Sequence, residues 1–188
     1  MLTFFYSPGS SSMAPHIALH EIGAPFEAKC LSLSKKDQKD PAYLAMNPEG
    51  KVPLLLVDGR PMTEVAGIMF YLAKAHPQAK LLPEDAEGQG HVVSWMSYAA
   101  SSLHPARKAG VDVAKEVFGR TDKRLAGREW FAGSYSIADI HVFRLFWKFT
   151  DYASPARADY PNLFAHYDRM MARPAVQKTI EIESQGIA

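Results

Sequence analysis

The segment YSPGSSSMAP, residues 6–15, carries three neighbouring serines at the point where a turn leads into a helical pattern. Pro8 and Gly9 indicate the turn, and serine side chains commonly satisfy free N–H groups at a helix N-terminus. The same N-terminus also attracts an anion, because its N–H groups are unpaired and the helix dipole is positive there. Residues 10–12 therefore indicate either helix capping or a site that stabilises negative charge during a reaction.

The segment NPEGKVP, residues 47–53, is a second candidate for ligand binding. Pro53 stands near the start of an apolar strand, where it cannot donate a hydrogen bond to a neighbouring strand. A trans proline that opens the strand is the commoner case. A cis bond would present the N–H and C=O of Val52 to a peptide-like ligand. The residues alone leave both conformations open.

Glu64, in the segment MTEVAGI at residues 62–68, is a third candidate. A helix is expected to begin here, with Thr63 as its N-cap. A carboxylate in the first turn complements the helix dipole, which is a common structural use. Together with the free N–H groups of that turn, it could also bind a ligand that carries both an amine and a carboxylate.

The helix expected at about 88–107 has one apolar and one polar side. The apolar stripe has helical spacing and consists of Val92, Met96, Ala99 and Leu103. The opposite side carries Ser94, Ser97, Ser101 and His104. A core-facing stripe backed by a solvated face explains this pattern. A polar side that lines a ligand cleft explains it equally well.

Other polar residues have structural explanations. Ser136 and Asp139 form a capping-box pattern before a strongly apolar helix. His16 and His20 have the spacing of metal ligands on a helix but no third ligand nearby, so they are expected in the core or at the surface. Cys30 lies within a strand and is expected to be buried. The chain has no Cys-x-x-Cys pair and no Gly-x-Gly-x-x-Gly loop, so neither dithiol chemistry nor a nucleotide cofactor is predicted, and no metal site either.

The composition indicates a globular protein, because the 188-residue chain is 47% hydrophobic and 22% charged. The formal net charge is +1, without a basic block, so nucleic acid is not expected as a partner. No apolar run approaches the roughly 20 residues of a membrane span, and no signal peptide is recognisable. With a single cysteine as well, the expected location is the cytoplasm.

Two domains are expected from the pattern of elements. The first has the order βαβαββα, with elements at 2–6, 12–23, 25–33, 42–46, a hairpin at 52–64, and a helix at 63–76. The second is all helical, with helices at about 88–107, 111–126, 136–151, 160–172 and 174–183. The predicted domains are 1–78 and 88–188, joined by a linker at 79–87.

Four segments in this order resemble the cytosolic glutathione transferases, and most closely the bacterial beta class. They are YSPGSSSMAPHIALHEIGAPFE, NPEGKVPLLLVDG, MTEVAGIMFYLA and GSYSIADI, and the resemblance covers nearly the whole chain. It implies a thioredoxin-like N-terminal domain and an all-α C-terminal helical bundle. It also implies a homodimeric transferase that conjugates glutathione, as cosubstrate, to a small hydrophobic electrophile in detoxification.

The resemblance further implies roles for individual residues. The proline that matches Pro53 is cis in the family, and Val52 pairs with the cysteinyl backbone of glutathione. The family's contacts to the γ-glutamyl group match Glu64 and Val65. Lys35 matches a lysine near the glycyl carboxylate, with Lys36 as the alternative. The positions that face glutathione and its thiol match Ser10, Ser11, Ser97, Ser101 and His104, of which Ser11 and His104 are expected to be catalytic. Ser10 or Ser12 could take the place of Ser11 at the thiol, and Tyr6 is an outside candidate.

The sequence departs from the family pattern at three places. Ser11 stands where the beta class usually has a cysteine, so a mixed disulfide with glutathione cannot form there. Val65 stands where the family usually has serine or glycine, and it offers only its backbone N–H. The region between SSLHPA and LAGREWFAG is shorter than usual, so the two helices that line the electrophile site should be truncated. Glutathione-dependent isomerisation, dehalogenation and a non-catalytic binding role are therefore kept as alternatives.

Overall fold

The computed structural model describes residues 1–186, and these form two compact units. One unit contains residues 1–75 together with the C-terminal segment 174–186. The other contains residues 76–173. The first unit combines a sheet with helices, whereas the described part of the second is helical.

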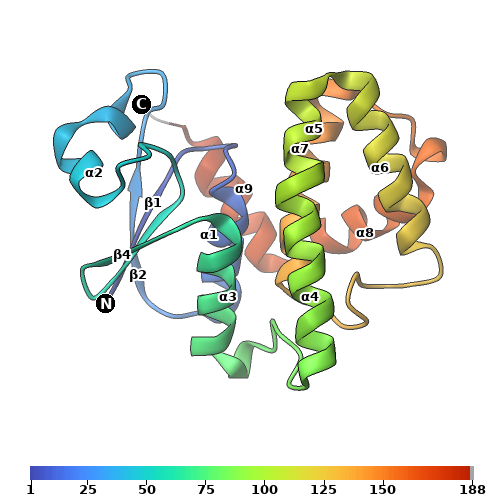
Figure 1. Cartoon of the computed structure of the whole chain (residues 1–188), viewed down its shortest axis with the longest axis horizontal. Helices are drawn as coiled ribbons and strands as arrows, with labels where there is room; N and C mark the ends of the chain where they lie inside the picture. Colours follow the sequence, from blue (N-terminus) through green and yellow to red (C-terminus); the bar gives the residue numbers. More distant parts are fainter. Residues whose placement is uncertain (187–188) are drawn as a thin grey trace. The chain divides into compact units, whose positions relative to one another are not determined.

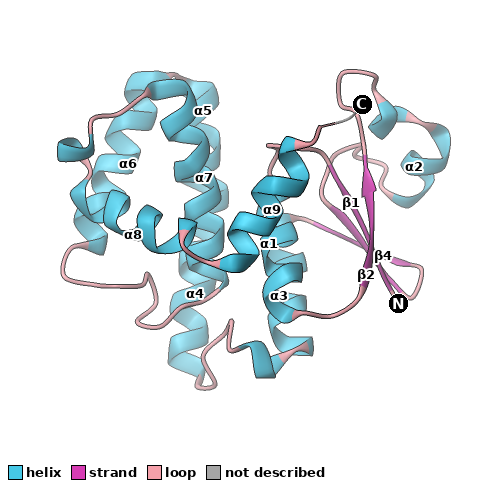
Figure 2. Ribbon diagram, turned by 180° about the vertical axis from the view of Figure 1, so that it is seen from behind, coloured by secondary structure: helices cyan, strands magenta, loops and turns pink. Residues whose placement is uncertain are grey.

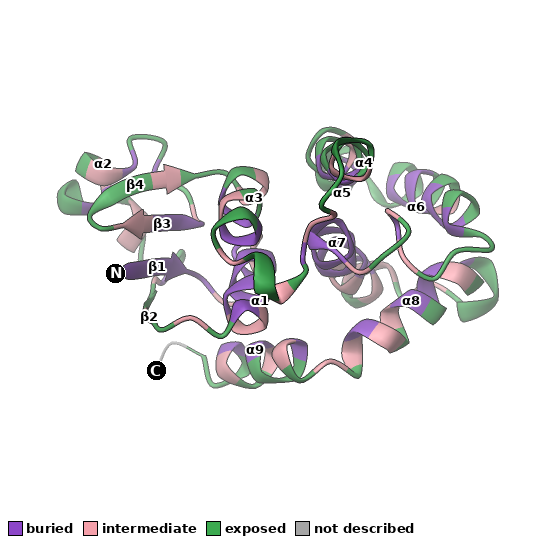
Figure 3. Ribbon diagram, turned by 90° about the horizontal axis from the view of Figure 1, so that it is seen from below, coloured by how far each residue is buried: buried purple, intermediate pink, exposed green. Residues whose placement is uncertain are grey.

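The sheet of the first unit, magenta in Figure 2, has four strands in the order β2-β1-β3-β4 (Figure 3). The strands are β1 (Leu2–Tyr6), β2 (Phe26–Cys30), β3 (Leu54–Val57) and β4 (Arg60–Thr63). Strand β1 pairs in parallel with β2 and antiparallel with β3, and β3 pairs antiparallel with β4. The apolar strands β1 and β3 are central and largely buried, while the more polar β2 and β4 form the edges.

Helices cover both faces of this sheet (Figure 3). Helices α1 (Met13–Ile22) and α3 (Val65–Ala75) lie on one face, whereas the 3₁₀ turn η1 (Asp37–Lys39) and α2 (Pro41–Met46) lie on the other. Alternation along β1 supplies both faces, because Phe4 contacts His16 on α1 and Phe5 contacts Tyr43 on α2. The last helix, α9 (Pro174–Ser184), lies beside α1 although the two are at opposite ends of the chain (Figure 1).

The second unit is built around α7 (Ile137–Ala153), which is buried over most of its length. Figure 3 shows α7 among the other long helices of this unit. These are α4 (Ala86–Tyr98), the π-helical segment η3 (Ala99–Leu103), α5 (His104–Ala109), α6 (Val111–Leu125) and α8 (Pro161–Met171). The 3₁₀ turns η2 (Pro77–Ala79) and η4 (Arg157–Asp159) complete the unit. The predicted helix at 88–107 is the continuous run of α4, η3 and α5, and Gly110 alone separates it from α6.

The predicted fold class is confirmed: a thioredoxin-like βαβαββα segment precedes an all-α region. The domain boundary at the C-terminus differs from the prediction of a helical domain spanning 88–188. Helix α9 belongs to the first unit, because its buried residues Val176, Thr179 and Glu183 form one face of the helix that packs near α1. The first unit also ends at Ala75 rather than at residue 78.

Two local predictions were also wrong. Thr63 is not an N-cap, because β4 continues to Thr63 and α3 begins only at Val65. Cys30 is exposed rather than buried, since it lies on the edge strand β2, where most side chains are accessible. Within residues 1–186, no helix combines the length and the apolar character that crossing a membrane requires.

Candidate active site

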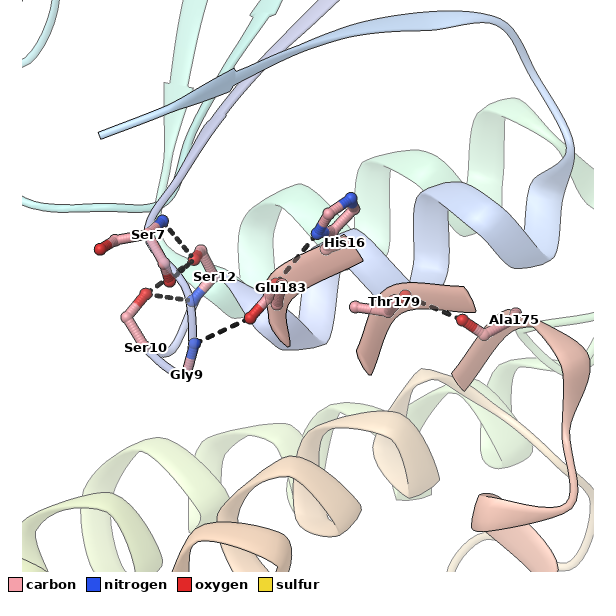
Figure 4. A network of polar contacts seen from close by, with 8 residues as sticks. All are labelled: Ser7, Gly9, Ser10, Ser12, His16, Ala175, Thr179 and Glu183. Atoms are coloured by element: carbon pink, nitrogen blue, oxygen red, sulfur yellow. Dashed lines mark hydrogen bonds and ion pairs between the residues drawn. The ribbon is translucent and has the colours of Figure 1, made fainter. Parts of the chain in front are cut away.

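Two of the three serines close the loop between β1 and α1 (Figure 4). The Ser12 side chain is fully buried, and its Oγ accepts from the Ser7 N–H at 3.1 Å and donates to the Ser7 carbonyl at 3.1 Å. Ser10 Oγ lies 2.7 Å from Ser12 Oγ and accepts from the Ser12 N–H at 3.2 Å. These hydroxyl groups therefore hold the loop in shape.

Ser11 points elsewhere. Its half-buried side chain donates from Oγ to the carbonyl oxygen of Val52 at 3.3 Å. The Val52–Pro53 bond is cis, as the family resemblance implies. The preceding carbonyl, of Lys51, accepts from Tyr43 Oη at 2.6 Å and Asn47 Nδ2 at 2.7 Å, and these two contacts hold the NPEG turn against α2. Of the three serine hydroxyls, the structure thus brings that of Ser11 to the backbone before Pro53.

Glu64 has an unusual backbone conformation between β4 and α3. Its φ is +66°, in the left-handed region that residues other than glycine rarely adopt. Its carbonyl accepts the first hydrogen bond of α3, from Ile68 N at 3.0 Å. The side chain is exposed, and the next residue, Val65, is half-buried. Residues held in such conformations are found at functional sites but also in ordinary turns, so the binding role of Glu64 stays a prediction.

Lys35 and Lys36 both carry exposed side chains in the loop that follows β2. The Lys35 N–H donates to Ser32 Oγ at 3.2 Å, and Lys36 has a φ of +63°. Both lysines therefore stay predicted partners of a carboxylate.

Glu183 of α9 ties the serine loop to α1, which the sequence did not predict (Figure 4). Its Oε2 accepts from the Gly9 N–H at 2.8 Å, and its Oε1 lies 2.9 Å from His16 Nδ1. The His16 and Glu183 side chains are only 1% and 6% exposed. Gly9 has a φ of +65°, so a side chain at this turn would be strained. His16 was expected in the core or at the surface, and the structure places it in the core. Its partner lies 167 residues away in sequence.

Burial also determines the charge of neighbouring groups in the first unit. The Tyr6 ring packs 4.7 Å from the His16 ring, and burial, followed by the neighbouring Cys30 thiol, raises the pKa of Tyr6 to about 12. Burial, followed by His16, lowers the pKa of His20 to about 4. Tyr6 therefore remains a neutral phenol within the packed core, and His20 remains uncharged at neutral pH.

The polar and apolar sides predicted for the first long helix of the second unit are confirmed. The apolar stripe is buried at Val92, Met96, Ala99 and Leu103. The opposite side is exposed at Ser94, Ser97, Ser101 and His104. Ser101 lies in the π-helical segment, a distortion that is frequent at functional sites.

Helix α7 carries two buried polar side chains, His141 and Asp139. Burial, followed by Arg144 and His104, lowers the pKa of His141 to about 3, so His141 is neutral. The Asp139 carboxylate is fully buried. It accepts hydrogen bonds from Ser136 in the predicted capping box and from Phe131 N at 3.0 Å, and it lies 3.2 Å from His166 Nε2. Asp139 is therefore structural, as expected.

Two family models match the chain in sequence. The N-terminal domain of glutathione S-transferase matches residues 10–75, and the C-terminal domain of the same family matches residues 84–174. The chain belongs to the glutathione S-transferase family. The predicted family and enzyme class are confirmed, whereas the roles of individual site residues stay predictions.

Relatives and solved structures agree with this assignment. The chain is 30% identical to glutathione S-transferase GstA of Escherichia coli O157:H7, over 97% of this chain and 98% of that protein. It is 36% identical to maleylacetoacetate isomerase of Rhizobium meliloti, over 66% of this chain and 58% of that protein. A sphingomonad glutathione S-transferase complexed with glutathione has a TM-score of 0.88 at 34% identity, covering 97% of this chain and 98% of that one. The beta-class enzyme of Sphingomonas chungbukensis has a TM-score of 0.87 at 33% identity, covering 96% and 98%.

Proposed function

We propose that this protein conjugates the thiolate of glutathione to small hydrophobic electrophiles, with Ser11 as the residue that stabilises the thiolate. One observation carries the proposal. Of the three adjacent serines, Ser10 and Ser12 bond within their own loop, whereas Ser11 Oγ reaches the Val52 carbonyl next to the cis bond. A peptide paired with the Val52 backbone would bring its side chain close to that hydroxyl.

The remaining contacts follow from the chemistry of a γ-glutamyl tripeptide. The cysteinyl N–H and C=O would pair with the C=O and N–H of Val52. Glu64 and the Val65 N–H would bind the amine and carboxylate of the γ-glutamyl group, and Lys35 would bind the glycyl carboxylate. On the helical unit, Ser97, Ser101 and His104 form the exposed polar side that we propose faces glutathione. The homodimer and the cytoplasmic location implied by the resemblance belong to the same proposal.

Stabilising the thiolate is the central chemical task. A free thiol has a pKa of about 8.5, so only a few per cent is ionised at neutral pH. Before glutathione binds, the Ser11 hydroxyl donates to the Val52 carbonyl. When the cysteinyl N–H of glutathione donates to the Val52 carbonyl, the Ser11 hydroxyl can donate to the glutathione sulfur instead. This hydrogen bond, with the positive end of α1, would lower the pKa of the thiol by about one to two units, at about 1.4 kcal/mol per unit.

The thiolate then attacks the electrophile directly. A carbon–sulfur bond forms, and either a leaving group departs with its electron pair or a proton from water completes an addition. No nucleophile from the protein is required, because glutathione supplies it. His104 is the proposed second donor to the sulfur or to the developing charge.

Isomerisation is the second candidate function, and the similarity to a maleylacetoacetate isomerase favours it. In that reaction class the thiolate adds to a conjugated double bond and leaves again after rotation. The same thiolate site serves both reactions. A non-catalytic binding role, suggested by Val65 and the shortened helical region, would need no lowered thiol pKa.

The test combines calorimetry of glutathione binding with the ultraviolet absorbance of the bound thiolate as a function of pH. We expect Ser11→Ala to raise the pKa of the bound thiol by about one unit, and Ser10→Ala to change it less. Folded protein that does not bind glutathione would contradict the whole proposal. Binding with an unshifted thiol pKa would favour the non-catalytic role.

A further inference from the structure

A cavity of about 630 Å³ opens on the sheet face that α2 covers. Its volume is within the range of about 300–1,000 Å³ that is typical of small-molecule sites. The floor is apolar and is formed by Phe5, Leu31, Tyr43 and Met46. Tyr43 is anchored below the surface, because its ring packs edge-on against Phe5 and its hydroxyl donates to the Lys51 carbonyl. The floor is therefore held in place without a ligand.

The rim of this cavity carries three lysines and two aspartates, which are Lys35, Lys36, Lys39, Asp37 and Asp40. Each of the two carboxylates already accepts a hydrogen bond from a backbone N–H group. Asp37 Oδ2 accepts from the Ser32 N–H at 2.7 Å, and Asp40 Oδ1 accepts from the Ala42 N–H at the start of α2 at 2.8 Å.

The ammonium groups of the rim have weaker partners. Lys39 Nζ donates to the carbonyl of Glu49 at 3.4 Å, and within residues 1–186 none of the three rim lysines forms an ion pair. Lys29 also lies 5.6 Å from the centre of the Phe5 ring, but it pairs with Glu27 at 3.4 Å and therefore adds little net charge. The rim thus presents positive charge around an apolar surface.

We infer that this cavity binds a small amphipathic anion, a carboxylate or sulfonate carried by an aromatic or branched apolar group. The apolar part would cover Phe5, Leu31 and Met46, and the anionic group would meet the lysines at the rim. A cation of the same shape would be repelled, and a neutral analogue would gain only the apolar contact.

Binding at this cavity should be coupled to the binding of glutathione. Lys35 lines the cavity and is also the predicted partner of the glycyl carboxylate. An anion in the cavity would compete for that ammonium group, so each ligand would weaken the other by the same factor. Only this coupling rests on the proposed function; the cavity itself does not.

The test compares three naphthalene probes of one shape: 1-naphthoate, neutral 1-naphthalenemethanol and cationic 1-naphthylmethylammonium. Amide chemical shifts measured by NMR during titration locate each probe. We expect 1-naphthoate to bind at least fivefold more tightly than the other two probes, to lose affinity with added salt, and to shift the amides of Phe5 and of residues 31–46.

Two kinds of variant separate charge from shape. Lys36→Ala/Lys39→Ala should weaken 1-naphthoate binding at least fivefold, whereas the matched control Lys123→Ala, at an exposed lysine on α6, should not. Ala42→Trp should fill the cavity and abolish binding without removing a charge. Thermal unfolding establishes that each variant is folded.

The inference is wrong if the neutral probe binds as tightly as the anion. It is equally wrong if the shifts fall outside Phe5 and residues 31–46, or if Lys36→Ala/Lys39→Ala and Ala42→Trp both leave 1-naphthoate binding unchanged. Calorimetry with glutathione alone tests the proposed function separately. Probe binding without glutathione binding would preserve the cavity and contradict the transferase, and the reverse result would contradict only the cavity.

Discussion

Each unit contains a buried carboxylate that ties a loop to a helix, and the two differ in what the loop carries. In the helical unit, Asp139 accepts from Phe131 and Ser136, and the loop between them has no predicted site residue. In the sheet-containing unit, Glu183 accepts from Gly9, and its loop continues directly into Ser10 and Ser11. The first carboxylate is expected to affect stability alone, while the second should affect stability and the thiolate site together.

Asp139→Ala should have the largest effect on stability. The change leaves the buried N–H groups of Phe131 and Ser136 without an acceptor and removes the partner of His166. At about 1–3 kcal/mol for each buried donor left unsatisfied, we expect the free energy of unfolding to fall by about 4 kcal/mol. Denaturant titration measures it, with exposed Asp151→Ala as the control.

The bound thiol of folded Asp139→Ala protein should keep its pKa. A raised thiol pKa in this variant would show that the two carboxylates do not differ in the way proposed here.

Glu183→Ala should have a smaller effect on stability but a second effect on the site. It removes the acceptor of the Gly9 N–H and the partner of the buried His16 ring, but it leaves fewer buried backbone N–H groups without an acceptor than Asp139→Ala does. We expect a loss of about 2–3 kcal/mol in unfolding free energy. Because the loop that carries Ser11 loses its anchor, glutathione affinity should fall and the pKa of the bound thiol should rise.

Glu181→Ala is the matched control for Glu183, since Glu181 is an exposed glutamate on the same helix. Glu183→Gln keeps an acceptor for Gly9 and should restore the thiol pKa more than the stability. If Glu183→Ala lowers stability without any change in the thiol pKa, Glu183 is structural in the same sense as Asp139.

The two carboxylates also show which contacts a sequence reveals. Asp139 and Ser136 are three residues apart, so their capping box is a local pattern that predicts its own geometry. Glu183 and Gly9 are 174 residues apart, and nothing in the amphipathic pattern of α9 indicates which residue it will meet. For the same reason α9 was expected in the helical domain, although it packs with α1 in the other unit.

The predicted site follows the same rule. The turn at Gly9 is a local pattern, whereas the cis bond before Pro53 was implied only by the family resemblance. The left-handed backbone of Glu64 was not predicted, because the helix was expected to begin with Thr63 as its N-cap. The separation of Ser11 from Ser10 and Ser12 could not be predicted, because it depends on the approach of the Val52 strand. The exposure of Cys30 was missed because strand order decides which strand is an edge.

Acid should destabilise the helical unit through His141. Burial lowers its pKa in the folded protein to about 3, below the ordinary 6.5, so the unfolded chain binds the proton more readily between these values. Stability is therefore full above pH 6.5 and falls as the pH decreases toward 3. At pH 5 we expect a loss of about 2 kcal/mol. His141→Leu should flatten this part of the pH profile, and His91→Leu, at an exposed histidine, should not.

The sheet-containing unit has a comparable histidine, His20, whose pKa burial lowers to about 4. Its side chain is only partly buried, so solvent screening should make its contribution smaller than that of His141. A His20→Leu variant that flattens the acid profile more than His141→Leu would reverse this ranking of the two units.

Ser12→Ala should have a smaller effect on stability than the changes at the two carboxylates, and it sharpens the comparison within the serine loop. The change leaves the buried Ser7 N–H and the Ser10 hydroxyl without one partner each, at a cost of about 1–2 kcal/mol in unfolding free energy. Ser11→Ala should cost less, because its hydroxyl is half-buried and the Val52 carbonyl can find water. The order of the two variants should reverse for the pKa of the bound thiol, where Ser11→Ala has the larger effect. A variant pair with the same order in both measurements would mean that the three hydroxyls serve only to hold the loop in shape.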